Sequence, residues 1–244
     1  MTGKHEEAIA MLRALEERYP GEAAVAAGLG AAFELSGNDA KALEWIREFA
    51  ARDPKAEDSS EWLHIRILEA KIGLARDPEW LRHNPVLGVT FGAEPHPEPP
   101  EEGFADETGR VLYATDVRLA IMHQLNLRLQ MFPTPDAMLG DLYMSAADLQ
   151  IAFNVPFHQP LLQYRCAIEL GVPNATLAKL RHDTFAAGNP PAAENAKRMF
   201  KRCRYKTLAP YGTHTRFPTG VIATLIVMCG VIFVSWARAR RRQR

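Results

Sequence analysis

The side chains that most often carry chemistry are scattered along this chain. Its eight histidines and three cysteines show no HxxxH or CxxC spacing, the spacing that brings two ligands to one metal ion. The short motif GLG at 28–30 could suggest a phosphate loop, but no strand precedes it, and close helix packing explains it better. The sequence also lacks GxSxG and P-loop motifs. We therefore predict no catalytic residue, no metal site, no cofactor and no small-molecule substrate.

One histidine stands inside a helical pattern. Ile65 and Leu68 recur at helical spacing after Ser59 and Ser60, either of which is a suitable helix cap, and His64 lies among them. No histidine, cysteine and carboxylate in the chain stand at metal-ligand spacing. We therefore interpret His64 as a partly buried packing residue rather than a ligand.

Charge excludes one class of partner. Lys and Arg together number 29, as do Asp and Glu, so the whole chain has no net charge that would favour nucleic acid. The segment KRMFKRCRYK at 197–206 mixes basic and aromatic residues, as nucleic-acid-binding segments do. Because it precedes an apolar segment near the C-terminus, we interpret it instead as a contact for anionic lipid head groups. The residues predicted to make this contact are Lys201, Arg202, Arg204, Lys206, Arg238, Arg240, Arg241 and Arg242.

The elements that would position any site begin with a repeat. Residues 3–20 (GKHEEAIAMLRALEERYP) match residues 37–54 (GNDAKALEWIREFAARDP) at a shift of about 34 residues, the period of helical-hairpin arrays. After the glycine, the matched positions have the spacing of the apolar face of an amphipathic helix. The paired residues are Gly3 and Gly37, Ala8 and Ala42, Ile9 and Leu43, Leu12 and Ile46, and Pro20 and Pro54.

Upstream of Gly37, the segment AAVAAGLGAAFELSG predicts the partner helix of the second match. The pair resembles the tetratricopeptide repeat, with one complete repeat at about 23–56 and only a second helix at 3–20. Phe49 stands where that family usually has alanine. We expect either a lost first helix or a start assigned too far downstream. The residues that carry the resemblance are Ala26, Leu29, Gly30, Phe33, Ala42, Ile46 and Pro54.

The resemblance implies a concave surface, lined by the first helix of each hairpin, that holds a peptide or a partner protein. The Lys and Asn residues with which some family members hold a C-terminal carboxylate are replaced here by alanine and carboxylate residues. A small-walled, acidic groove would suit a basic or apolar partner segment. The alternative is that these residues only pack against neighbouring helices. The lining positions are Ala24, Ala27, Ala31 and Glu34 in one repeat and Asp58, Glu61, Ile65, Leu68 and Glu69 in the next.

The rest of the chain predicts further helices and no convincing sheet. Residues 92–103 (GAEPHPEPPEEG) are rich in proline and glutamate, which indicates an extended, solvated linker. Helical patterns resume at 112–131, 136–153, 158–173, 174–188 and 190–204. The expected organisation is all-α, with a right-handed helical-hairpin solenoid at 1–80, a linker at 81–110 and a second helical block at 111–206. Within that block, residues 136–173 resemble a divergent further tetratricopeptide hairpin.

An apolar segment near the C-terminus predicts a membrane anchor. Residues 219–237 have no charged side chain over a length sufficient to cross a bilayer. A juxtamembrane segment at 207–218 precedes them, and a basic tail at 238–244 follows. Both flanks are basic, so the orientation stays open, although the arginine tail slightly favours a cytoplasmic C-terminus.

Together these patterns predict a non-enzymatic scaffold or adaptor that displays a tetratricopeptide-like groove at a membrane, on a single-pass anchor. The alternative is a structural subunit of a larger membrane complex, assembled through its anchor and juxtamembrane helices.

Overall fold

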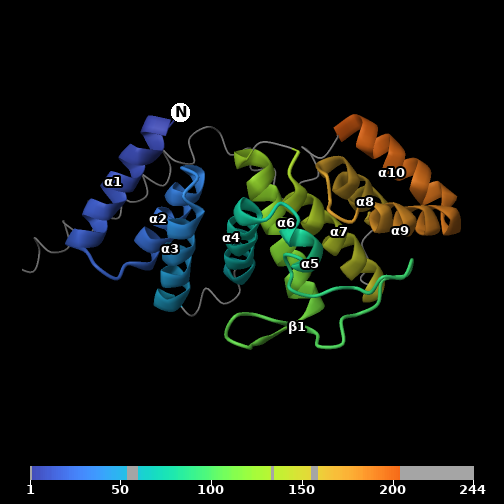
Figure 1. The fold of residues 1–244 in the computed structure, drawn as a ribbon, viewed down its shortest axis with the longest axis horizontal. Helices are drawn as coiled ribbons and strands as arrows, with labels where there is room; N and C mark the ends of the chain where they lie inside the picture. Colours follow the sequence, from blue (N-terminus) through green and yellow to red (C-terminus); the bar gives the residue numbers. More distant parts are fainter. Residues whose placement is uncertain (1, 54–59, 133–134, 155–158, 204–244) are drawn as a thin grey trace, which may run out of the picture. The chain divides into compact units, whose positions relative to one another are not determined.

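The computed structural model describes residues 2–53, 60–132, 135–154 and 159–203, and these ranges are mostly helical (Figure 1). The all-α class is thereby confirmed, and the described elements belong to one compact unit, residues 1–209. The helices are α1 (Thr2–Arg18), α2 (Ala23–Leu35), α3 (Asp39–Arg52), α4 (Glu61–Arg76), α5 (Trp80–His83), α6 (Ala114–Met131), α7 (Ala137–Ala152), α8 (Pro160–Leu170), α9 (Ala175–Gly188) and α10 (Pro190–Cys203), and the strands are β1 (Phe104–Ala105) and β2 (Val111–Leu112).

α2 and α3 form a closely packed helical hairpin. The turn between them contains Gly37, whose φ of +83° is a backbone conformation that favours glycine, and Asn38 caps α3 by accepting a hydrogen bond from Lys41 N at 3.2 Å. Gly30 permits the close approach, because a Cβ there would lie 2.4 Å from Ile46 Cδ1. Six of the residues that carry the tetratricopeptide resemblance are buried in this hairpin, namely Ala26, Leu29, Gly30, Phe33, Ala42 and Ile46, and the seventh, Pro54, lies outside the described residues.

α4 is shared between two hydrophobic cores and lies between α3 and α6 (Figure 1). Its residues Ile65 and Leu68 join the core of the α2–α3 hairpin. Its residues Leu63, Ile67 and Ala70 face the other way and belong to the larger core, which α6, α7 and α8 also build. The hairpin and the second helical block are therefore packed against opposite faces of one helix.

The segment between α5 and α6 is not the solvated linker that its composition suggests. Five of its apolar residues are buried in the larger core, and β1 and β2 pair as a short antiparallel hairpin with Phe104 opposite Leu112. The glutamates at 92–103 are exposed, but Pro97 is buried, and the carbonyl oxygens of Gly92 and Glu94 accept hydrogen bonds from Arg181. The five residues in the larger core are Val86, Leu87, Phe91, Phe104 and Leu112.

The second helical block is built around α7, which is buried along nearly its whole length. Asp136 caps it by accepting hydrogen bonds from Met138 N at 2.9 Å and Leu139 N at 3.1 Å. α8 begins with Pro160 and ends at Gly171, whose φ of +86° is the usual left-handed termination of a helix. These local signals explain why the helices begin and end close to the positions that the sequence predicts.

The predicted membrane location is corrected by the structure. Among the described residues, no helix combines the length and the apolarity that crossing a bilayer requires. The segment 219–237 and its flanks at 207–218 and 238–244 lie outside the described residues. Lys201 and Arg202 lie at the end of α10, where Lys201 is exposed. The other residues of the predicted lipid contact lie outside the described ranges, namely Arg204, Lys206, Arg238, Arg240, Arg241 and Arg242.

Candidate functional site

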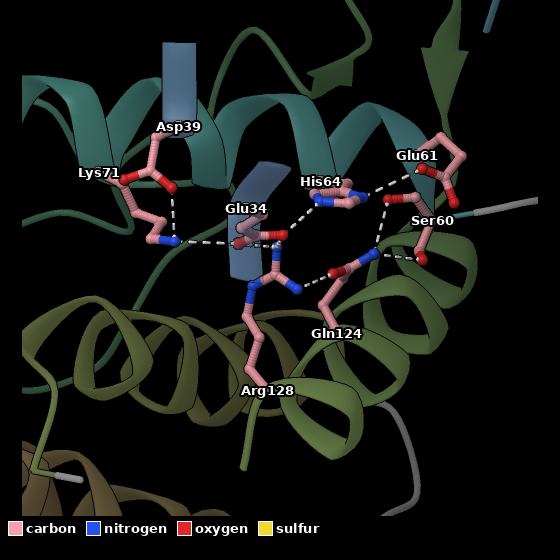
Figure 2. A network of polar contacts seen from close by, with 8 residues as sticks. All are labelled: Glu34, Asp39, Ser60, Glu61, His64, Lys71, Gln124 and Arg128. Atoms are coloured by element: carbon pink, nitrogen blue, oxygen red, sulfur yellow. Dashed lines mark hydrogen bonds and ion pairs between the residues drawn. The ribbon is translucent and has the colours of Figure 1, made fainter. Parts of the chain in front are cut away.

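The most developed polar site in the described part of the chain is a buried ionic network where α2, α4 and α6 meet (Figure 2). Glu34 comes from the last turn of α2, and Arg128 comes from the last turn of α6. His64 and Lys71 lie seven residues apart on α4 and therefore point from the same face of that helix. We call the eight residues drawn in Figure 2 the α2–α4–α6 network: Glu34, Asp39, Ser60, Glu61, His64, Lys71, Gln124 and Arg128.

His64 lies between two carboxylates. Its Nε2 is 2.8 Å from Glu34 Oε2, and its Nδ1 is 3.2 Å from Glu61 Oε2. Burial by itself would lower the pKa of His64, but the hydrogen bonds to Glu34 and Glu61 outweigh burial and raise that pKa above its ordinary value. The predicted role of a packing residue is therefore incomplete, because His64 is also the polar centre of this contact.

Glu34 is almost fully buried and accepts from three cations. Besides His64, Lys71 Nζ lies 3.2 Å from its Oε1 and Arg128 Nη2 lies 3.2 Å from the same atom. Burial would raise the pKa of Glu34, but the hydrogen bond with His64 and the charges of Arg128 and Lys71 lower it to about 2. Glu34 is thus ionised at every pH at which the protein would normally work.

The outer members of the network connect it to further elements. Arg128 Nη1 donates to Gln124 Oε1 at 2.8 Å, and Gln124 Nε2 donates to Ser60 Oγ at 2.7 Å. Lys71 Nζ donates to Asp39 Oδ1 at 2.7 Å, which adds the first turn of α3. With His64 protonated, three cations face three carboxylates. The arrangement therefore joins four helices by balanced charge.

A second buried network holds the segment after α5 against α7 and α9. Arg181 is 1% exposed, and its Nη1 donates to Asp148 Oδ2 at 2.5 Å. Its Nη2 donates to the carbonyl oxygens of Phe91 and Gly92, and its Nε donates to that of Glu94. Tyr164 Oη completes the site by donating to Asp148 Oδ1 at 2.6 Å. Burial raises the pKa of Asp148 to about 6.

Asp141 gives the same segment a further anchor and leads to a testable prediction. Its Oδ2 accepts from Val86 N at 2.9 Å, and burial raises its pKa to about 7. Because that value lies above the ordinary aspartate pKa of about 4, ionisation of Asp141 destabilises the fold increasingly as the pH rises from about 4 to 7. We expect Asp141→Asn to raise the melting temperature at pH 8 and to change it little at pH 4, since the amide oxygen still accepts from Val86 N.

The measurement is thermal unfolding by circular dichroism at both pH values. Asp116→Asn, at an exposed position in the first turn of α6, is the matched control and should show no such difference between the two pH values. An equal loss of stability for Asp141→Asn at pH 4 and pH 8 would contradict the role given to burial.

The groove residues expected from the sequence are dispersed by the structure. Ile65 and Leu68 are 3% and 0% exposed in the hairpin core, so neither can line a surface. Glu34 and Glu61 belong to the α2–α4–α6 network, and Glu69 accepts from Arg47 Nη2 at 2.6 Å. Asp58 lies outside the described residues. On α2, Ala24 and Ala31 are exposed and Ala27 is half-buried, so these three remain at the surface.

The expected groove residues are buried by packing contacts that a pairwise comparison of repeats does not include. In the expected array, one side of each first helix would stay open, but here α6 packs along α4 and brings Arg128 to Glu34, while Ile65 and Leu68 are buried in the core of the α2–α3 hairpin. The one sequence signal for this contact is an arginine among the apolar positions of α6, because a buried guanidinium requires an acidic or carbonyl partner.

Comparison with known proteins adds no relative, since no protein-family model, no curated protein and no solved structure matches this chain. The fold and its networks define an all-α protein in which a helical hairpin is joined to a second helical block by buried ion pairs.

Proposed function

We propose that this protein is a non-enzymatic binding protein that holds a segment of a partner protein on one face of α2. This surface, called the alanine face below, consists of Ala24, Ala27 and Ala31. The observation that carries the proposal is that this face of α2 stays at the surface while the opposite face is packed against α3. The tetratricopeptide resemblance supports it, because in that family the first helix of a hairpin lines the groove.

The structure favours an apolar partner segment over a basic one. The acidic side chains that would have made the groove attractive to a cation already have cationic partners within the protein, since Glu34 pairs with Lys71 and Arg128 and Glu69 pairs with Arg47. Methyl side chains present no bulk and no charge. A partner helix or extended segment could therefore approach α2 closely and bury apolar surface against it.

Site-specific photo-crosslinking in cells tests this function. A crosslinking amino acid at position 24 should trap a discrete partner, whereas the same probe at Leu180, which is 46% exposed on α9, should not. Introducing Ala31→Glu should remove the adduct, because it places a charge in the apolar contact, and Leu180→Glu should leave it unchanged. Glutamate is a good helix former, so both variants should stay folded, which circular dichroism would check.

A second probe position tests the β-hairpin as an alternative binding surface. Tyr113, the residue after β2, is 74% exposed, and Val111 of β2 is 73% exposed. An adduct at position 113 without one at position 24 would show that the partner binds the β-hairpin instead. Equal adducts at positions 24 and 180 would contradict a specific binding face on α2.

A further inference from the structure

The position of His64 requires two protons on its ring. Both ring nitrogens face carboxylate oxygens, at 2.8 Å for Glu34 and 3.2 Å for Glu61. A neutral imidazole has one N–H donor and one lone pair, so it can donate to only one of these carboxylates. Its other nitrogen would then place a lone pair against an ionised oxygen. Only the imidazolium satisfies both contacts.

The charges around His64 point to the same protonation state. Glu34 faces it from α2, Glu61 and Lys71 lie on its own helix, and Arg128 faces it from α6. Asp39 at the start of α3 binds Lys71, and Gln124 of α6 adds a neutral amide. With an imidazolium the three acids and three cations balance. Loss of the proton removes the positive charge that His64 places next to Glu34, which is only 4% exposed.

We propose that His64 is a protonation switch. As an imidazolium it binds the C-terminal end of α2 to α4, and when it loses its proton this end of α2 becomes less tightly held. The helix that is released is the one that carries the alanine face. Mildly acidic conditions would therefore hold that face rigid, and mildly alkaline conditions would make it mobile. The consequence for partner binding rests on the proposed function, whereas the protonation-dependent contact between α2 and α4 does not.

The direction with pH follows from linkage. The pKa of His64 is raised in the folded protein, so its contribution to stability is complete below the ordinary histidine value of about 6.5. That contribution is lost as the pH rises through the folded pKa. Glu34, whose pKa is lowered to about 2, stays ionised throughout this range and does not titrate with it.

Two variants distinguish a protonation switch at His64 from a histidine that only packs. Glu61→Gln keeps the shape of the side chain but lets its amide donate to Nδ1, so a neutral His64 can still donate from Nε2 to Glu34. His64→Gln keeps one donor towards Glu34 and cannot titrate. Both variants should make the end of α2 insensitive to pH between 6 and 8.5. In Glu61→Gln the neutral ring keeps both of its contacts, and in His64→Gln no group at this position titrates in this range. The exposed residue His123 on α6 is the matched control, and His123→Gln should leave the pH response intact.

The experiment measures amide hydrogen exchange and histidine titration by NMR on the full chain. In the wild type we expect the protection factors of the last turn of α2 to fall by about threefold to tenfold between pH 6 and pH 8.5, relative to α9. His64 should titrate above the ordinary histidine value, and Glu61→Gln should lower its pKa. Using the same two pH values, the photo-crosslinking yield at position 24 would report the effect on binding.

Each outcome decides a different claim. The protonation switch would be contradicted if His64 titrated at or below its ordinary pKa. It would also be contradicted if the α2 protection of the wild type responded to pH no more than that of His64→Gln. If the protection changed as expected but no discrete adduct formed at position 24 at either pH, the protonation switch would be supported and the proposed function would be contradicted.

Discussion

Replacing Arg181 with methionine should destabilise the protein by about 3–5 kcal/mol, because it leaves the buried carboxylate of Asp148 without its cation. The same change removes the donors to the carbonyl oxygens of Phe91, Gly92 and Glu94. Buried acceptors without donors add to the loss, since each has given up its hydrogen bond to water. In a domain of this size, thermal unfolding should show a decrease of about 10 °C in the melting temperature.

Two variants identify the cause of that decrease. Lys179→Met is the matched control, because Lys179 lies two residues earlier on α9 with a side chain that is 70% exposed, and it should change the melting temperature by less than about 2 °C. Adding Asp148→Asn to Arg181→Met should recover part of the loss, since the double variant no longer buries an unpaired charge. If the double variant were less stable than Arg181→Met, the charge pairing would not be the dominant contribution.

Replacing Gly140 with alanine should be the most disruptive single-methyl change in the second helical block. A Cβ at this position of α7 would lie 2.8 Å from Val172 N and 3.0 Å from Ala167 O. Both are backbone atoms, so no side-chain rotation can relieve the contact, and α7 must move away from the end of α8. We expect a net loss of about 1–3 kcal/mol in the free energy of unfolding, even though alanine favours helix more than glycine does.

Gly188 supplies the control for this prediction. It is the last residue of α9, and a Cβ there would meet no atom within 4 Å. Gly188→Ala should therefore leave the stability unchanged or raise it by up to about 1 kcal/mol. Chemical denaturation of both variants measures the difference. A Gly140→Ala protein as stable as Gly188→Ala would mean that α7 and α8 are farther apart than the structure shows.

The helices themselves could be predicted from the sequence because their signals are local. Asp136 and Asn174 each accept from a backbone N–H of the first helical turn, and Pro160 and Gly171 mark the two ends of α8. The spacing of Leu29, Phe33 and Ile46 also indicated which faces of α2 and α3 would be buried. Each of these signals lies within one or two helical turns, so it can be seen in a single sequence.

The candidate site could not be predicted in the same way. Glu34 and Arg128 are 94 residues apart, and no repeat pattern relates them. The segment at 92–103 has the composition of a linker, so its anchoring by Arg181 and the nearby anchoring of Val86 by Asp141 were not anticipated. In both cases a charged residue binds a group far away in the sequence, and its own surroundings in the sequence do not reveal the partner.

The sequence by itself therefore determined the helical class, the helix ends and the apolar faces of the α2–α3 hairpin, because hydrophobic spacing and capping act over a few residues. Only the tertiary structure decided that α4 would be covered on both sides, that Glu34, Ile65 and Leu68 would be buried rather than line a groove, and that His64 would bridge two carboxylates. The physical reason is that a helix face is open or covered according to which other helices pack on it. The α2–α3 hairpin covers Ile65 and Leu68, and Arg128 reaches Glu34 from α6, a part of the chain with no local relation to α2 or α4.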